Sequence, residues 1–483
     1  MNDDLNETFI KIYNSYSKSI ELFEPSDPGM VKTYVCGPTV YDYTHVGHGR
    51  TYVIFDALRR YFNLRGYNVY FIVNITDIDD KIINRANSEG RDWTSVVDEF
   101  TRDYMDAISK LNVKVDLHPR VSSHINEIIE FISVLIERDY AYVTKSGNVY
   151  FNVDKYPDYG SLSSKRDKTL WSQEEEFLSE KRNPYDFALW KAAKPGEPWW
   201  PSPWGRGRPG WHIECSVMSS RYLGSTIDIH GGGSDLLFPH HENERAQSES
   251  FFGKRPWVKY WVHTGLLMVR GNKMSKSLGN IVALRESFKK WRPEVHRIFY
   301  LSLHYRKPQD YSDEALEQAS AFYERLVGAV NILKKLSKEA VEQHYMNDND
   351  IRVLREVMDT RRKFHEALSN DFNTAKALSA VHELTAIIYR ELQYNPKYTL
   401  VWKAYQLLRE YNVVLGVLDK HFEEAPEEMK SIVDDLLKVI VDVRKELRQR
   451  KLYDLADSIR SELEKKGVKL MDKGLETTWI IEK

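Results

Sequence analysis

Hydrophobic positions in the first part of the chain change between the spacing of strands and the spacing of a helix. Residues 31–36 form a short apolar run that predicts a buried strand, and residues 67–73 are again rich in β-branched and aromatic side chains. Between them, residues 51–64 carry apolar side chains at the spacing of one helix face. This order predicts a βαβ unit, and hence a parallel sheet with a right-handed crossover. Ligands of such sheets lie at the carboxyl ends of the strands, where Cys36 and residues 74–77 stand.

The pattern changes twice further along the chain. Residues 149–153 have strand character, and residues 194–211 are dense in Trp, Pro and Gly, which indicates an inserted module rather than another βαβ repeat. From about residue 312 the apolar spacing is that of long amphipathic helices. One face is traced by Phe322, Leu326, Val330 and Leu333, and another by Leu452, Leu455, Ile459 and Leu463, which Gly467 would end.

Length and composition set broad limits on the fold. A chain of 483 residues suggests about three domains, and 42% hydrophobic with 29% charged residues excludes a disordered or collagen-like protein. The 69 basic and 71 acidic side chains give a net charge of −2. Because the chain has no overall basic field, a nucleic-acid partner would have to be held by local patches.

Cysteine use points to a reducing compartment. Cys36 and Cys215 are the two cysteines of the chain and lie far apart in the sequence, which excludes a disulfide scaffold. Before any context is considered, two inert core thiols explain them. The acidic N-terminus has no apolar signal region, and no apolar run is long enough to span a membrane. We therefore expect a cytoplasmic protein with no membrane partner.

Two short segments have the composition of phosphate-binding loops. In the first, Gly47 separates His45 from His48 near the predicted start of a helix, whose N–H groups favour anions. In the second, Lys273 and Lys276 lie on a polar loop flanked by glycines, where two ammonium groups can neutralise a polyphosphate. A solvated lysine loop explains the second segment equally well when it is taken alone.

Two further segments have the composition of a metal site and a nucleotide site. His240 and Glu244 are four residues apart and share a helix face; with Cys36 and Cys215 they form a donor set suited to zinc. His241 is a competing donor, and an exposed acidic helix is the plain alternative. Residues 228–235 contain three consecutive glycines and Asp235, which suits a flat ring or a ribose, although a flexible turn also explains them.

Taken together, these motifs resemble those of the class I aminoacyl-tRNA synthetases. Residues 45–48 (HVGH) are similar to the HIGH signature of that class, and residues 273–277 match its KMSKS loop. Four more segments resemble the cysteinyl-tRNA synthetase family: residues 34–42, 74–81 (NITDIDDK), 207–215 (GRPGWHIEC) and 230–244. The resemblance extends from about residue 10 to residue 479. It implies an α/β protein with a class I Rossmann-type parallel sheet, an inserted connective module, a helical bundle and a small C-terminal anticodon-binding module.

The resemblance also implies roles for single residues. The zinc ligands would be Cys36, Cys215, His240 and Glu244, and Thr76 and Trp211 would line the cysteine pocket together with Cys36 and His240. His45 and His48 would bind ATP phosphates, Lys273 and Lys276 would be the catalytic lysines of the mobile loop, and Asp235 would lie near the adenosine. The implied cofactors are one Zn²⁺ per chain and Mg²⁺ with ATP. The implied partners are L-cysteine, ATP and tRNA(Cys), with the protein a monomer.

By the same resemblance the chain has six parts, which comprise two halves of the catalytic domain, one insertion and three segments that contact tRNA. These are, in order, a first catalytic half at 1–130, a connective insertion at 131–208, a second catalytic half at 209–255, a region with the lysine loop and stem contacts at 256–318, a tRNA-binding helical bundle at 319–425 and an anticodon-binding module at 426–483. An insertion of this size is too small for the editing domain that related synthetases carry.

Two features depart from the family pattern or stay open. Val46 replaces the isoleucine of the HIGH signature, and residues 480–483 replace the usual basic tail. A basic cluster near the C-terminus has Glu446 as its opposing charge and is either an RNA contact or a solvated helix face. It consists of Arg444, Lys445, Arg448, Arg450 and Lys451.

Three rival functions remain at this point. The cysteine ligase of mycothiol biosynthesis resembles the same catalytic core but joins cysteine to an amino-sugar, and it should lack a full anticodon module. Other nucleotidyltransferases with the HIGH motif are short and do not explain the metal donors. A paralogue that only binds RNA or metal would not need the intact histidines and lysines.

Overall fold

The computed structural model describes residues 9–171, 178–274, 279–339, 345–423, 427–473 and 476–481. Lys276 and the adjoining serines of the lysine loop lie outside these residues. The chain divides into two compact units, residues 1–419 and residues 420–483, and each is described by itself.

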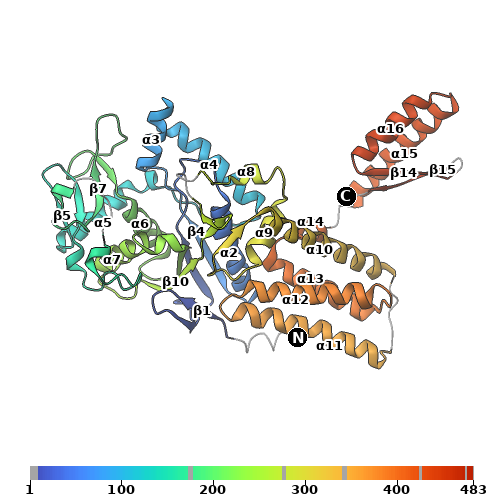
Figure 1. The fold of residues 1–483 in the computed structure, drawn as a ribbon, viewed down its shortest axis with the longest axis horizontal. Helices are drawn as coiled ribbons and strands as arrows, with labels where there is room; N and C mark the ends of the chain where they lie inside the picture. Colours follow the sequence, from blue (N-terminus) through green and yellow to red (C-terminus); the bar gives the residue numbers. More distant parts are fainter. Residues whose placement is uncertain are drawn as a thin grey trace. The chain divides into compact units, whose positions relative to one another are not determined.

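A four-stranded parallel sheet forms the centre of the first unit (Figure 1). Its order is β10 (Val258–Thr264), β9 (Ile227–Gly233), β3 (Met30–Val35) and β4 (Asn68–Val73), and every neighbouring pair is parallel. Helix α2 (Val46–Leu64) connects β3 to β4. The predicted βαβ unit and the α/β fold class are therefore confirmed.

Helix α2 begins earlier than the apolar spacing indicates. The prediction of a start at Thr51 was wrong, because the helix begins at Val46 and His45 is its N-cap. The backbone N–H of His48 donates to Nδ1 of His45 at 3.3 Å, which closes the first turn. Hydrophobic periodicity does not report such a turn, since it is built from glycine and histidine. As a result both histidines lie at the amino end of the helix, beside the sheet's carboxyl edge.

The insertion forms its own antiparallel sheet and shares a core with the central sheet. Its strands are β5 (Ala141–Val143), β6 (Val149–Phe151), β7 (Phe187–Ala192) and β8 (Gly207–Pro209), paired in that order. Helices α3 (Asp80–Glu89), α4 (Trp93–Lys110) and α5 (Ile125–Glu137) precede it, and α6 (Trp211–Leu223) follows. The hydrophobic cluster of the insertion joins Phe151 and Trp190 to Tyr34 and Trp261 of the central strands. This packing lets the insertion deliver the start of α6 to the sheet edge.

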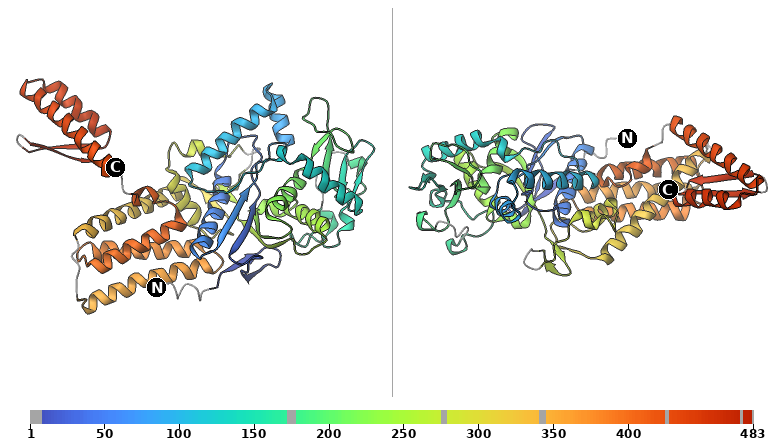
Figure 2. Two further views of the ribbon diagram at one scale, coloured as in Figure 1. Left: turned by 180° about the vertical axis from the view of Figure 1, so that it is seen from behind. Right: turned by 90° about the horizontal axis from the view of Figure 1, so that it is seen from above.

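The first unit also contains two short hairpins and a set of helices. One hairpin pairs β1 (Lys11–Asn14) with β2 (Ser19–Leu22). The other pairs β11 (Leu267–Val269) with β12 (Asn272–Lys273), and the other edge of β11 pairs with β13 (Gln309–Tyr311). The helices are α7 (His240–Phe252), α8 (Leu284–Ser287), α9 (Pro293–Leu301), α10 (Asp313–Glu339), α11 (Asp348–Ser369), α12 (Thr374–Ile387), α13 (Tyr398–Leu415) and α14 (Asp419–Phe422), which ends in the second unit. In both directions of view, helices α10–α13 lie on the side of the sheet opposite the insertion (Figure 2).

A buried arginine ties helix α2 to the hairpin that carries Lys273. Arg50 is 1% exposed, and its guanidinium donates to the carbonyl oxygens of Gly265 (2.7 Å), Leu266 (2.9 Å) and Lys307 (2.5 Å). Three main-chain acceptors from two segments therefore converge on one side chain. This fixes the base of the β11–β12 hairpin to the helix that begins with the two histidines.

We expect Arg50→Met to lower the stability of the first unit by at least about 3 kcal/mol, because buried carbonyl groups without a donor cost about 1–3 kcal/mol each. The stability of Arg50→Lys, which keeps the charge but has fewer hydrogen-bond donors, should lie between those of the wild type and Arg50→Met. Thermal unfolding of the three proteins checks this. An unchanged melting temperature in Arg50→Met would contradict the anchoring role.

The second unit packs two helices and a hairpin. They are α15 (Glu427–Gln449), α16 (Tyr453–Lys465), β14 (Val468–Lys473) and β15 (Glu476–Ile481). Arg444 of the basic cluster is buried, and its Nε donates to the carbonyl of Ala456 at 3.2 Å, so this residue joins α15 to α16. Leu452 and Leu455 are 46% and 55% exposed, so the predicted apolar face of α16 was wrong at these two positions.

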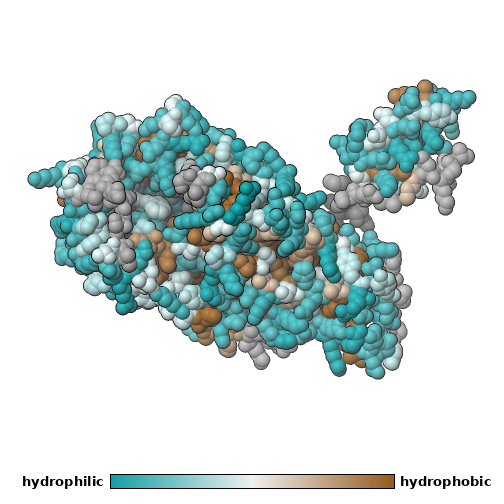
Figure 3. Space-filling view, viewed as in Figure 1, coloured by the Kyte–Doolittle hydropathy of each residue, from teal (hydrophilic) through white to brown (hydrophobic). Residues whose placement is uncertain are grey.

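The surface of the described residues is largely hydrophilic in the view of Figure 3, with apolar side chains in small patches. None of the described helices is both long and apolar enough to cross a membrane.

Candidate active site and metal centre

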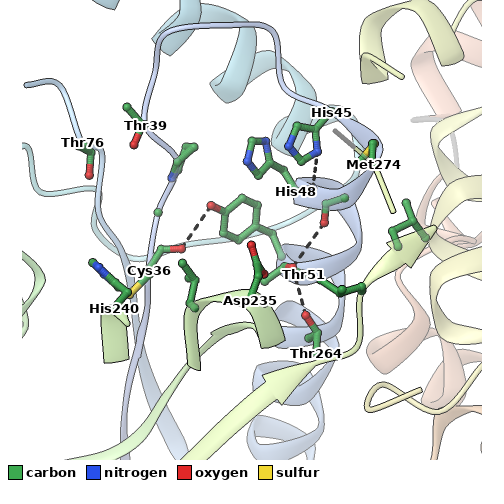
Figure 4. Close-up of a pocket in the computed structure, with 18 of the residues that line it drawn as sticks. Cys36, Thr39, His45, His48, Thr51, Thr76, Asp235, His240, Thr264 and Met274 are labelled. Carbon is green, nitrogen blue, oxygen red and sulfur yellow. Dashed lines mark hydrogen bonds between the residues drawn. The ribbon is translucent and has the colours of Figure 1, made fainter. Parts of the chain in front are cut away.

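One cavity lies at the carboxyl edge of the central sheet, next to the amino end of α2. Its volume is about 310 Å³. Figure 4 shows Cys36 and His240 at one end and His45 and His48 at the other. Every described residue of the predicted site lines it except Glu244: Cys36, His45, His48, Thr76, Trp211, Cys215, Asp235, His240 and Lys273. The cavity thus joins the metal-like and phosphate-like motifs in one space.

The loops after β3 and β4 are held together by a close backbone approach at Gly37. Its N–H donates to Oδ1 of Asn74 at 2.7 Å, and a Cβ at position 37 would lie 1.5 Å from the main-chain oxygen of Asn74. Only glycine fits there. Two backbone bonds continue the contact, from Thr76 N–H to the carbonyl of Pro38 (3.1 Å) and from Val40 N–H to the carbonyl of Thr76 (3.2 Å). This contact brings Thr76 to the cysteine end of the cavity.

The four predicted metal ligands come together in a buried cluster. Cys36 follows β3, Cys215 lies on α6, and His240 and Glu244 lie on the first turns of α7. Their donor atoms all lie within 4.8 Å of one another. Nε2 of His240 is 3.0 Å from Oε1 of Glu244, as the spacing of four residues predicts.

A second set of four donors shares two of these residues. Cys36 and Glu244 also cluster with His230, in the middle of β9, and with His241 of α7. Sγ of Cys36 is 3.3 Å from Nε2 of His241 and 3.8 Å from Nε2 of His230. Neither histidine lines the cavity, and Nδ1 of His241 is 2.8 Å from Nε2 of His263. His230 was not predicted as a donor, although it lies in the glycine-rich segment 228–235.

The charges of the cluster favour a cation. Burial lowers the pKa of His240, but the Glu244 carboxylate and the Cys215 thiolate outweigh it and raise the pKa to about 10. Burial also opposes ionisation of Cys215, yet hydrogen bonds from Cys36 and His240 lower its pKa to about 6. Burial and the adjacent Cys215 raise the pKa of Cys36. The protonated His240 therefore lies between the thiolate of Cys215 and the carboxylate of Glu244. A bound metal ion would supply the same positive charge to these two anions.

The cavity wall beside the donor cluster is built from two different parts of the chain. Trp211 begins α6, and its ring centroid lies 4.4 Å from that of His240. Thr76 accepts a hydrogen bond from Nδ2 of Asn74 (3.2 Å) and donates to Oε2 of Glu214 (3.3 Å). Burial, followed by the charge of Cys215, raises the pKa of Glu214. These bonds fix the Thr76 hydroxyl at the cavity wall.

The opposite end of the cavity contains stacked imidazoles. The rings of His45 and His48 lie 3.6 Å apart, and Nδ1 of His48 is buried without a hydrogen-bond partner among the described residues. Burial, and then the charges of His45 and Lys81, lower the pKa of His48 well below its usual value. His48 is therefore a neutral hydrogen-bonding group. Lys273 of β12 and Asp235 line the same end, while Lys276 lies outside the described residues.

Protein families match two stretches of the chain. Residues 22–321 match a family described as tRNA synthetases class I (C) catalytic domain. Residues 363–419, which include the end of α11 with α12 and α13, match the DALR domain.

Curated relatives match the chain over nearly its whole length. A protein named Cysteine--tRNA ligase from Staphylothermus marinus is 64% identical over 471 residues, which are 98% of this chain and 99% of the relative. Proteins of the same name from Aeropyrum pernix and Saccharolobus solfataricus are 54% and 52% identical, and each alignment covers at least 97% of this chain and 99% of the relative.

Solved structures share the fold at low sequence identity. A Mycobacterium tuberculosis methionyl-tRNA synthetase in complex with methionyl-adenylate superposes with a TM-score of 0.57 and 16% identity, covering 80% of this chain and 90% of that one. An Agrobacterium radiobacter LeuRS in a ternary complex with tRNA and LeuAMS has a TM-score of 0.62 and 13% identity, covering 83% and 86%. At these identities the likeness concerns the fold alone.

Proposed function

The chain belongs to the family of cysteine–tRNA ligases, and we infer that it activates L-cysteine with ATP and transfers the cysteinyl group to the 3′ end of tRNA(Cys). The observation that carries this inference is the cavity that joins the thiol-rich donor cluster to the HVGH histidines and Lys273. The match continues through the DALR domain and over nearly the whole chain, which favours tRNA over an amino-sugar as the acceptor.

The chain's own residues supply position and electrostatics rather than a nucleophile. The substrate carboxylate attacks the α-phosphate of ATP and pyrophosphate leaves; the cysteinyl group then passes from the adenylate to a ribose hydroxyl of the tRNA. We propose that His45 and His48 donate hydrogen bonds to the phosphates, because they lie at a helix amino end and His48 is neutral. Lys273 and Lys276 would stabilise the charge that builds on pyrophosphate, and Asp235 would accept from the adenosine.

The donor cluster fits a zinc ion, one per chain, held by Cys36, Cys215, His240 and Glu244. Two thiols, an imidazole and a carboxylate within 4.8 Å are ligands that zinc accepts. We prefer this set to the one with His230 and His241 because Cys215 and His240 line the cavity. When bound, such a borderline-soft cation would favour the substrate's thiolate over a hydroxyl.

The preference of such a cation for a thiolate would let the enzyme select cysteine over serine, which the rest of the pocket separates poorly. Serine differs from cysteine by one atom, and an apolar pocket separates such near-isosteres by only about 1–3 kcal/mol. Trp211 and Thr76 would hold the backbone of the amino acid beside the donor cluster, so that the side chain of the substrate points toward it.

Cysteine-dependent exchange of pyrophosphate into ATP tests the activation step. We expect exchange with cysteine and more than about 200-fold less with serine at equal concentration, since the discrimination must exceed the roughly 10–200-fold that an apolar pocket provides. Equal exchange with both amino acids would contradict the assignment of the pocket.

Several finer assignments remain proposals. Mg²⁺ is expected to accompany ATP, and the protein is proposed to act as a cytoplasmic monomer. The six-part division, with boundaries near residues 130, 208, 255, 318 and 425, is kept as a proposal for domain roles. Within the basic cluster, Lys445 and Arg448 are exposed residues of α15 that could contact RNA, whereas Arg444 is buried.

A further inference from the structure

Three consecutive residues of a loop at the cavity wall are each contacted by a cationic side chain from another segment. Tyr41, Asp42 and Tyr43 follow β3 and line the same cavity as the two histidines. Lys81 lies over the ring of Tyr41, Arg85 pairs with Asp42 at 3.5 Å, and Arg285 lies over the ring of Tyr43. Neither Lys81 nor Arg285 is among the groups proposed above to contact cysteine or the phosphates of ATP, and the charge of Lys81 adds to the effect of burial, the larger cause, in lowering the pKa of His48.

Lys81 is an exposed cation held by an aromatic ring instead of a carboxylate. Its ammonium is 5.5 Å from the centre of the Tyr41 ring, and it forms no ion pair with a carboxylate among the described residues. The nearby acidic groups are engaged elsewhere: Asp79 caps α3 by accepting from the Lys81 backbone N–H (2.8 Å), and Asp80 pairs with Lys191 (3.0 Å) and Arg208. The charge of Lys81 is therefore available to an incoming anion.

Arg285 is the second such cation. Its guanidinium carbon lies 3.3 Å from the centre of the Tyr43 ring, and its side chain is 46% exposed. Its ion pair with Glu286, at 3.4 Å, joins two half-exposed side chains and neutralises little of its charge. Tyr43 is itself fixed, because its hydroxyl donates to Oε1 of Glu99 at 3.3 Å.

The two cations come from segments that are tied to the same loop. The segment that follows the lysine loop is bonded to the region before α2, through Leu284 N–H to the carbonyl of Thr44 (2.8 Å) and Val46 N–H to the carbonyl of Val282 (3.0 Å). Lys81 lies in the first turn of α3, directly after the loop that carries Thr76. Tyr41, Tyr43, Lys81 and Arg285 are called the mouth rim below. The mouth rim is thus a basic and aromatic surface in which Tyr41, Tyr43 and Lys81 line the cavity and Arg285 packs on Tyr43.

We propose that the mouth rim binds the phosphates of the unpaired 3′ end of the tRNA as it reaches the adenylate. This rests on the proposed function. Single-stranded nucleic acids are held by cations along the backbone combined with aromatic side chains, which is the composition of this surface. ATP is the less suitable occupant, because the groups proposed for its phosphates include the buried Nδ1 of His48, while Lys81 is exposed. A polymer that enters from outside meets the exposed cations first.

The test separates transfer to tRNA from activation. Lys81→Met and Arg285→Met keep an apolar side chain against each ring and remove the charge. We expect each to lower kcat/KM for tRNA in aminoacylation about tenfold, as removal of a charge-assisted hydrogen bond to phosphate does, with cysteine-dependent ATP–pyrophosphate exchange within twofold of wild type. The double variant should reduce the slope of log kcat/KM for tRNA against log salt by about 0.7 for each phosphate that the protein no longer neutralises.

Controls keep the outcome clear. Lys168→Met removes a lysine that lies over Trp171 and Tyr185 and does not line the cavity, so aminoacylation should be unchanged. Lys81→Arg, which keeps the charge, should retain most of the wild-type kcat/KM for tRNA. The proposal is overturned if exchange falls as much as aminoacylation, which would place the cations at ATP, or if aminoacylation and its salt slope stay as in wild type. Absence of cysteine-dependent exchange in the wild-type protein would instead refute the proposed function itself.

Discussion

Replacing Cys215 with serine is expected to remove the bound metal and cysteine activation together. Cys215 is buried on α6, and its thiol has a pKa lowered to about 6, so it presents a thiolate at neutral pH. A serine hydroxyl stays protonated and is a poor zinc ligand. Changes to groups that merely orient a ligand cost about 10–100-fold in metal affinity, so loss of a ligand should exceed about 100-fold in both metal binding and cysteine-dependent exchange.

Metal content of the purified protein and exchange kinetics check this prediction. Ser219→Ala is a matched control, because Ser219 is also buried on α6 and its hydroxyl donates within the helix, to the carbonyl oxygen of Ser216 at 3.2 Å. It should retain metal and activity. A Cys215→Ser protein with a full complement of metal and normal discrimination against serine would show that the ligand assignment is wrong.

Replacing His48 with alanine is expected to slow cysteine activation about 10²–10³-fold, the usual cost of removing one donor that stabilises transition-state charge. Nδ1 of His48 is buried without a partner among the described residues, and the side chain lines the cavity. His48→Asn keeps an amide donor on a shorter side chain and should recover part of the rate. The loss should appear in kcat of exchange more than in KM for cysteine.

The pH dependence gives an independent check on His48. Burial and the neighbouring His45 and Lys81 hold the pKa of His48 well below its usual value, so the imidazole is neutral on both sides of neutral pH. The ratio of wild-type to His48→Ala rates should therefore be flat between about pH 6 and pH 8. A ratio that rises as the pH falls would mean that His48 acts as a cation.

Two features that depend on the spacing of neighbouring residues in the sequence were predicted correctly. The βαβ unit followed from apolar runs, and the pairing of His240 with Glu244 followed from a spacing of four residues on a helix, which the structure has at 3.0 Å. The start of α2 was not predictable in this way, because after the capping His45 and Val46 the first turn consists of Gly47, His48 and Gly49, which show no apolar spacing.

The parts that depended on tertiary packing could not be predicted. Lys81 and Arg285 meet the same short loop only because α3 and the segment after β12 fold against it, and no sequence spacing reports that. Arg444 belongs to a run of basic residues, which is typical of a solvated face or an RNA contact. It is buried because α16 packs against α15, where Nε of Arg444 donates to the carbonyl oxygen of Ala456.

Charging of purified tRNA(Cys) tests the central claim most directly. With ATP and Mg²⁺, the wild-type protein should esterify cysteine to the 3′ end of the tRNA, and it should form no detectable seryl-tRNA when serine replaces cysteine. Removal of the proposed zinc ion by a chelator, followed by assay with Mg²⁺ restored, should abolish charging. A protein that exchanges pyrophosphate with cysteine but leaves tRNA(Cys) uncharged, or one that charges serine as readily as cysteine, would contradict the account.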